Sequence, residues 1–335
     1  MLARAELQGV LLLSRRLAGA VILLWLVVTL TFVLVRLAPG DAAELLTPPT
    51  ATAEDAARFR AEAGLDRPVL VQYARWLGGA LRGDFGESLA SARPVTDILA
   101  ESLPISLALG ALSLALTFLI GVTVGAIQAV RRGRGTDVAM TLLTTTVYAA
   151  PSYWLALALI AVFTYGAARW GFPAALRLPA FGMRDPAREA VGIAALVDLV
   201  RHAVLPVFVL TAIGAAGIAR YARSSIADIL RMEFVRTAWA KGLGSRGVYA
   251  RHVLSNALPP LVILLALSLP GIVAGAIFVE TVFAWPGMGR VMVTAIAARD
   301  YPVIMGATVL YAALVILANL AADLMLPWLD PRRGD

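Results

Sequence analysis

The chain has 335 residues, of which 60% are hydrophobic and only 15% charged, and its mean hydropathy is +0.80, whereas roughly a quarter of the residues in a soluble domain are charged. It contains no cysteine and only two histidines, His202 and His252, which excludes disulfides and thiol chemistry and makes a metal site a poor interpretation. The net charge is +7, and the basic residues lie between apolar segments rather than on one soluble face. This distribution favours contact with anionic membrane lipid and argues against binding of nucleic acid.

Six apolar stretches are long enough to cross a bilayer, for which a helix needs about 20 residues. They cover residues 17–35, 103–130, 138–165, 202–219, 257–279 and 303–322. Pro151 divides the third stretch and predicts a tilt or kink there. The first stretch exceeds the apolar core of a signal peptide, and no small-residue cleavage site follows it, so we expect it to remain as a helix. The predicted fold class is all-α: a polytopic membrane protein with six transmembrane helices.

The basic residues predict which side of the membrane each loop occupies, because short loops rich in arginine and lysine stay in the cytoplasm. With the N-terminus inside, the cytoplasmic segments carry fifteen basic residues against six acidic ones. The external segments mix arginine with many acids, such as Glu54, Asp55 and Glu62. We therefore expect both termini in the cytoplasm.

An external insert, residues 38–102, separates the first two spans and is too long to be a simple connection. Thr52 and Asp55 resemble a capping box at the start of a helix, and Gly64 is placed to end it. Pro68 predicts the start of a second helix. We expect a small helical extracytoplasmic insert.

A second informative segment, residues 220–255, joins the fourth and fifth spans on the cytoplasmic side. Its apolar residues recur at helical spacing beside charged ones: Phe234, Val235, Ala238 and Trp239. Gly242 then interrupts the helix, and Ser245 is placed to cap a second helix that leads into the fifth span. The chain is thus divided into three parts: the N-terminus with the first span (1–37), the insert (38–102), and the membrane core with the cytoplasmic segment (103–335).

The residues from Glu233 to Leu243 resemble the EAA loop of permease subunits of binding-protein-dependent ABC importers, in its dipeptide/oligopeptide form. Other segments of the chain also resemble motifs of this family and occur in the family's order. They are residues 83–88, 94–104, 278–290, 299–306 and 319–332. The likeness covers nearly the whole chain. The long insert after the first span resembles that of the B-type subunit rather than its C-type partner.

Two departures from the general EAA pattern are visible. Arg236, Thr237 and Ala238 occupy the positions of Glu-Ala-Ala, and the terminal Leu-Pro of the pattern falls on Leu254 and Ser255. Substitutions of this kind are usual in the peptide-permease branch. They favour the branch without assigning individual contacts.

The resemblance implies a type I ABC importer permease (MetI-like) architecture in a bacterial or archaeal inner membrane. It implies these partners: a homologous C-type permease subunit, two ATPase subunits and an extracytoplasmic solute-binding protein. It assigns coupling to the ATPases to Glu233, Arg236, Thr237, Ala238, Lys241 and Gly242, and docking of the binding protein to Trp285, Pro286, Gly287 and Arg290. It identifies no substrate-binding residue.

The sequence also indicates that ATP is hydrolysed by another chain. Lys241 is the only lysine, and it is followed by glycine without a preceding phosphate-binding loop, so no Walker A motif is possible. The predicted subunit is therefore non-catalytic and needs no cofactor of its own, because its partner subunits bind the ATP.

Several single residues have a structural interpretation that outweighs a functional one. We expect His202 and His252 to pack at span ends or contact lipid headgroups, and Glu280 and Asp323 to cap helices or reach the interface. Two Gly-x-x-x-Gly pairs, Gly121 with Gly125 and Gly271 with Gly275, permit close helix contact.

Alternative functions make different demands on the sequence. An ion-coupled secondary transporter would need charges at the membrane midplane, and the predicted spans lack them. An intramembrane hydrolase would need a nucleophile beside a base, and neither histidine has an evident serine partner. Among ABC importers, the same permease type also carries nickel, glutathione or other small solutes, and the sequence does not separate these from peptides.

Overall fold

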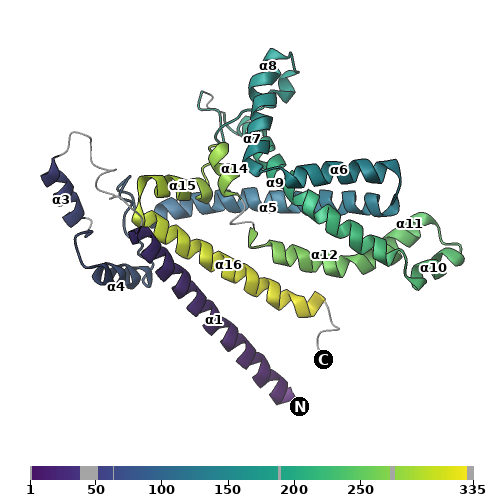
Figure 1. Ribbon diagram of the computed structural model, residues 1–335, viewed down its shortest axis with the longest axis horizontal. Helices are drawn as coiled ribbons and strands as arrows, with labels where there is room; N and C mark the ends of the chain where they lie inside the picture. Colours follow the sequence, from purple (N-terminus) through teal and green to yellow (C-terminus); the bar gives the residue numbers. More distant parts are fainter. Residues whose placement is uncertain (1, 38–51, 63, 188–189, 272–275, 330–335) are drawn as a thin grey trace. The chain divides into compact units, whose positions relative to one another are not determined.

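The computed structural model describes residues 2–37, 52–62, 64–187, 190–271 and 276–329 (Figure 1). The described residues are predominantly helical, with one isolated bridge between Glu87 and Pro94. The chain divides into two compact units, one formed by residues 1–104 and 291–317 and the other by residues 105–290 and 318–335.

Within the described residues, six helical segments are long and apolar enough to cross a membrane, as predicted. They are Ser14–Leu37, Val95–Val130, Ser152–Arg169, Ile193–Ile229, Ser245–Ser268 and Tyr301–Ala322. The second and fourth extend well beyond the predicted bounds, because their ends continue in helical residues that mix apolar with charged side chains, such as Asp97, Asp198 and Arg201.

The third predicted stretch is corrected from one kinked helix to two helices. α6 (Gly135–Ala149) ends at Ala150, whose ψ of 129° is extended, and α7 (Ser152–Ile160) begins after Pro151. The proline ring sterically disfavours the helical conformation at the preceding residue, so the helix breaks there. The candidate span continues from α7 through a π-helical stretch, Ala161–Gly166, into α8 (Ala167–Arg169).

The fifth stretch is also corrected. Its candidate span begins earlier than predicted, with α11 (Ser245–Gly247), a π-helical stretch (Val248–Leu254) and α12 (Ser255–Ser268). The predicted end of this span instead forms the separate helix α14 (Ile277–Val282). Gly275, one member of the second glycine pair, lies outside the described residues.

The first unit contains α1 (Leu2–Leu37), the helices of the insert, the start of α5 (Val95–Val130) and the start of α16 (Tyr301–Leu329). Val28 and Phe32 of α1 are buried in one cluster with Met305 of α16. The ring of Phe32 packs edge-on against Tyr73 with 5.1 Å between centroids. The insert is thereby attached to two spans.

The predicted ends of the insert helices are confirmed. In the capping box, the Thr52 backbone N–H donates to Asp55 Oδ2 at 2.9 Å, and the Asp55 N–H donates to Thr52 Oγ1 at 3.2 Å. Helix α3 (Ala53–Glu62) follows, and Gly64 beyond it has a φ of +66°. Helix α4 (Val69–Ala80) begins directly after Pro68. The segment 38–51 lies outside the described residues.

The second unit is organised around α9 (Ile193–Ile229), against which α6, α7, α12 and α14 pack. Helix α5 also approaches α9 closely at Gly125. A Cβ added to Gly125 would lie only 2.5 Å from the carbonyl oxygen of Ala219. The glycine at this position removes that clash, and the expected close helix contact of the first glycine pair is confirmed. Among the described residues, the second unit also contains α10 (Glu233–Ala240), a short 3₁₀ turn (Ala174–Leu176) and the first residues of α15 (Met288–Ala298), most of which belongs to the first unit.

Candidate functional site

The predicted amphipathic helix between the fourth and fifth spans is present as α10. Its outer side carries Glu233 and Arg236, an ion pair with an O···N distance of 2.9 Å whose side chains are 85% and 70% exposed. Thr237 Oγ1 donates to the Glu233 carbonyl, and Lys241 is exposed just beyond the helix. Exposed ion pairs contribute little to the stability of the fold, so these charged side chains remain accessible for contact with another protein.

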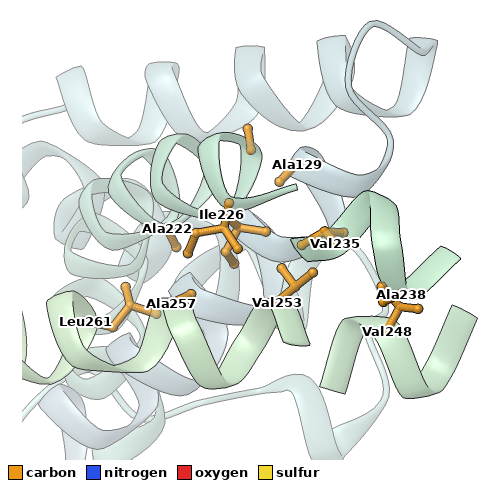
Figure 2. Packing of buried hydrophobic residues seen from close by; sticks show 11 residues of the cluster. Ala129, Ala222, Ile226, Val235, Ala238, Val248, Val253, Ala257 and Leu261 are labelled. Atoms are coloured by element: carbon orange, nitrogen blue, oxygen red, sulfur yellow. The ribbon is translucent and has the colours of Figure 1, made fainter. Parts of the chain in front are cut away.

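The inner side of α10 packs against a buried base, defined by eleven apolar residues (Figure 2). Val235 and Ala238 of α10 join residues of four other helical stretches in this base: Ala129, Ala222, Ala227, Ile226, Ile229, Val248, Val253, Ala257 and Leu261. Close-packed interiors resist compression and transmit displacement. A force on α10 would therefore reach α9 and α12 together.

The break after α10 lies at the predicted glycine. Gly242 has a φ of +79°, a left-handed conformation that side chains other than glycine rarely adopt, and its N–H donates to the Trp239 carbonyl at 2.9 Å. The predicted cap by Ser245 is wrong. Gly244 occupies the N-cap position, with no side-chain cap, and Ser245 is already the first residue of α11.

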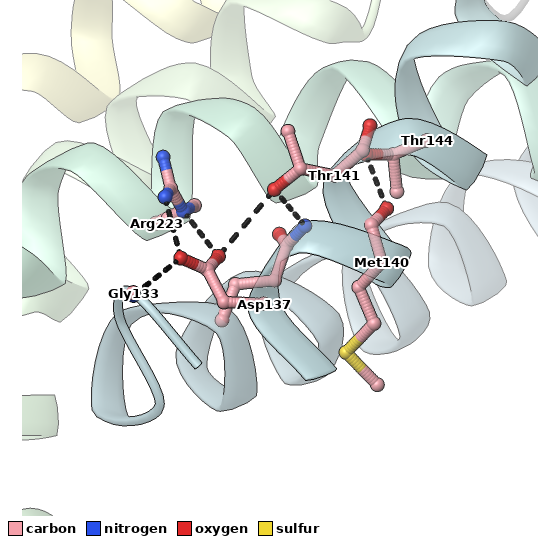
Figure 3. A network of polar contacts seen from close by, with 7 residues as sticks. Gly133, Asp137, Met140, Thr141, Thr144 and Arg223 are labelled. Atoms are coloured by element: carbon pink, nitrogen blue, oxygen red, sulfur yellow. Dashed lines mark hydrogen bonds and ion pairs between the residues drawn. The ribbon is translucent and has the colours of Figure 1, made fainter. Parts of the chain in front are cut away.

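A polar network that the sequence did not reveal joins the start of α6 to α9 (Figure 3). Asp137 accepts hydrogen bonds from Arg223 Nε at 2.9 Å and Nη2 at 2.8 Å, and from the Gly133 N–H at 3.0 Å. The side-chain hydrogen bonds of Arg223 hold the pKa of Asp137 below its usual value. The sequence offered no local signal for this pair, because an acid in the first turn of a helix is already favoured by the free N–H groups there, and Arg223 lies 86 positions away.

Glu280 does not reach the interface, and that part of the prediction is wrong. It is 1% exposed and accepts from the Ser106 hydroxyl at 2.6 Å and from the Gly289 N–H at 2.7 Å. The Met288 N–H donates in turn to Ser106 Oγ at 2.8 Å. Ser106 and Glu280 thus cap the first turn of α15, which confirms the capping alternative. The Asp323 side chain lies outside the described side chains.

The residues predicted for binding-protein docking divide into buried and exposed ones. Trp285 is 4% exposed, and a Cβ on Gly287 would lie 2.4 Å from Ser106 Oγ. These two positions therefore build the turn before α15. Pro286 and Arg290 are exposed, and Arg290 Nη1 also donates to the Ala284 carbonyl at 2.8 Å.

The two histidines take different positions. His202 is buried on α9, with Nδ1 2.8 Å from the Asp198 carbonyl oxygen, so its role is packing rather than headgroup contact. His252 is half-buried in the π-helical stretch before α12.

These features define a class of protein: a polytopic helical membrane protein in which a short exposed helix is seated on two spans. Family models match both parts of the chain. Residues 121–335 match the binding-protein-dependent transport system inner membrane component, and residues 10–110 match the N-terminal part of such a membrane component. The chain belongs to this family of inner-membrane components, and the predicted helical fold with six candidate spans is confirmed within the described residues.

Relatives of known name match over nearly their whole length. The chain is 40% identical over 323 residues to a Brucella ovis protein that is provisionally named a peptide permease, covering 96% of this chain and 97% of that one. It is 35% identical to an oligopeptide transport system permease protein of Bacillus subtilis, covering 96% and 98%. It is 36% identical to a glutathione transport system permease protein of Salmonella paratyphi A, covering 95% and 96%.

Proposed function

We propose that this chain is the B-type permease subunit of an ATP-driven ABC importer and forms half of the translocation pathway for dipeptides or oligopeptides. The observation that carries the proposal is α10, an exposed charged helix on a buried base shared with α9 and α12. The peptide and oligopeptide permeases among the relatives supply the solute class.

The proposed partners each meet a different part of the chain. A homologous C-type permease subunit completes the pathway, and two ATPase subunits contact α10 through Glu233, Arg236 and Lys241. An extracytoplasmic binding protein delivers the solute and docks near Pro286 and Arg290. The subunit is non-catalytic and has no cofactor of its own.

The proposed cycle is alternating access. The spans have two packings, and closure of the ATPases on ATP favours one of them through α10. Since Val235 and Ala238 are buried in the base, α10 cannot shift without moving the helices that share it.

Glutathione is the second candidate solute, because the glutathione permease is as similar to this chain as the oligopeptide permease, at 36% against 35% identity. Glutathione is itself a tripeptide with free carboxylates. Competition between labelled dipeptide and unlabelled glutathione during uptake would rank the two.

A pair of proline variants tests the coupling role. Gly242→Pro forces φ from +79° to the negative value of proline and removes the N–H that donates to Trp239, so α10 should be misdirected. Gly244→Pro is the matched control, because Gly244 already has a φ of −65°. We expect Gly242→Pro to abolish ATP-driven uptake by the reconstituted complex and to weaken co-purification of the ATPases, whereas Gly244→Pro retains both. Wild-type uptake by Gly242→Pro would exclude α10 as the coupling element.

The orientation is tested by labelling, since the chain has no native cysteine. Arg82→Cys in the insert and Ser245→Cys at the start of α11 both replace exposed residues. An impermeant maleimide added to spheroplasts should label the first and not the second. The reverse pattern would invert the proposed topology.

A further inference from the structure

The second unit contains an open cavity of about 890 Å³ whose walls come from α5, α6, α7, α9 and α12. Its size falls in the range of small-molecule sites, roughly 300 to 1,000 Å³. The walls combine apolar groups with hydroxyls: Ser113, Thr117, Tyr148, Ser152, Tyr221 and Ser268. Such a surface can hydrogen-bond a peptide without selecting its side chains.

One of these hydroxyls is both buried and without an internal partner. Ser113 is 4% exposed, and among the described residues its Oγ has no hydrogen-bond partner. A buried hydroxyl without a partner is disfavoured relative to one that is hydrogen-bonded. Ser113 belongs to the cavity wall, so this unpaired hydroxyl lies in the layer of side chains that surrounds the cavity.

Arg220 is the only charged residue among the described residues that line the cavity. Its guanidinium carbon lies 3.9 Å from the centroid of the Tyr148 ring. Gly217, one turn earlier on α9, leaves room for that ring, since a Cβ there would already lie 3.3 Å from Tyr148 Cε2. The stacked ring fixes the guanidinium plane while leaving its N–H groups available.

Arg223 on the same helix provides the contrast. Arg223 is bound by the Asp137 carboxylate, whereas in the described part of the chain no carboxylate pairs with Arg220. A planar guanidinium recognises a carboxylate through two parallel hydrogen bonds. The cavity therefore presents one available carboxylate receptor.

We propose that this cavity holds the solute during transport and that Arg220, oriented by Tyr148, binds a carboxylate of the solute. This assignment rests on the proposed function and adds to it: carboxylate-bearing peptides are preferred by the permease itself, independently of the binding protein. The exposure of Arg220 keeps the contact weak, which suits a site that must also release its ligand.

Cysteine protection tests the proposal without the binding protein. Ser268→Cys places a single, nearly isosteric thiol in the cavity wall of the cysteine-free chain. In the assembled, nucleotide-free complex in nanodiscs, the dipeptide Ala-Phe should protect this thiol from a maleimide at concentrations about tenfold lower than Ala-Phe amide. Arg220→Gln should remove the difference and Arg220→Lys should keep part of it. Arg169→Gln, an exposed arginine outside the cavity, should leave it unchanged.

A second variant separates recognition from folding. Tyr148→Leu keeps the Arg220 charge but releases the guanidinium, so the preference for the free carboxylate should fall, whereas Tyr148→Phe should keep it. Equal protection by both peptides in the wild type, or an undiminished preference in Arg220→Gln, would overturn the role of Arg220. Absence of protection by either peptide in a complex that still imports Ala-Phe would overturn the cavity as the solute site. A wild-type complex that imports no peptide at all would instead refute the proposed function.

Discussion

Asp137 and Glu280 are both buried carboxylates of the second unit, at 3% and 1% exposure, yet they are satisfied in different ways. Asp137 accepts two hydrogen bonds from a guanidinium, and Glu280 accepts from a hydroxyl and a backbone N–H. A guanidinium favours the ionised carboxylate, whereas burial among neutral dipoles disfavours it. The two groups therefore have different physical roles.

The Asp137 pair joins two helices by charge. Burial of an ion pair carries a desolvation cost, so its value lies less in stability than in fixing one arrangement of α6 and α9. Glu280 instead terminates a helix, supplying an acceptor to N–H groups that have no partner within α15. Removing one partner of each pair should separate these roles.

The largest effect is expected for Arg223→Ala, which leaves the Asp137 carboxylate buried without its counter-charge. Loss of one partner of a buried pair costs about 3 to 5 kcal/mol, and the lower end applies because the Arg223 side chain is 34% exposed. Thermal unfolding of the purified complex measures the loss. Arg231→Ala, which replaces an exposed arginine in the turn after α9, serves as the control. Restored stability in Arg223→Ala combined with Asp137→Asn would attribute the loss to the stranded charge, and no restoration would contradict that cause.

A smaller effect is expected for Glu280→Ala, which leaves the Ser106 hydroxyl and the Gly289 N–H without their acceptor. Unsatisfied buried polar groups cost roughly 1 to 3 kcal/mol. Glu280→Gln keeps one acceptor oxygen and should lose less. The same unfolding assay ranks the two variants, and hydrogen exchange at the first turn of α15 localises the effect. Equal losses for both variants would show that the negative charge, rather than the acceptor, caps this helix.

The smallest effect is a difference in pH dependence. Both groups lie outside the six candidate spans. The Arg223 hydrogen bonds lower the pKa of Asp137, so its contribution is present above the unfolded pKa and is lost as the pH falls through the folded value. Burial raises the pKa of Glu280, against the opposing hydrogen bonds from Ser106 and Gly289, so its contribution is present below the unfolded pKa and is lost as the pH rises through the folded value.

Unfolding temperatures between pH 4 and 8 test these opposite signs. Toward low pH, the difference in unfolding temperature by which the wild type exceeds Asp137→Asn should shrink. The unfolding temperature of the wild type relative to that of Glu280→Gln should instead rise. Parallel changes in the two comparisons would contradict the distinction between the carboxylates.

The sequence alone determined the features that depend on local chemistry. Apolar length predicted the six spans, the spacing of Val235 and Ala238 predicted α10, and the Thr52 and Asp55 pattern predicted the start of α3, because each depends on residues within a few turns of one another. The end of α10 was likewise predicted from Gly242, because its left-handed conformation is one that few other residues adopt.

Only the tertiary structure decided how the buried polar groups pair. Asp137 meets Arg223 across 86 positions, and Ser106 meets Glu280 across 174, so no local pattern distinguishes these partners from other serines and arginines. Burial of Trp285, which the family resemblance had assigned to a docking surface, depends in the same way on the helices around it. Periodicity specifies which side of a helix is apolar, but which helix covers that side, and which charge lies opposite another, is fixed by packing among segments distant in sequence.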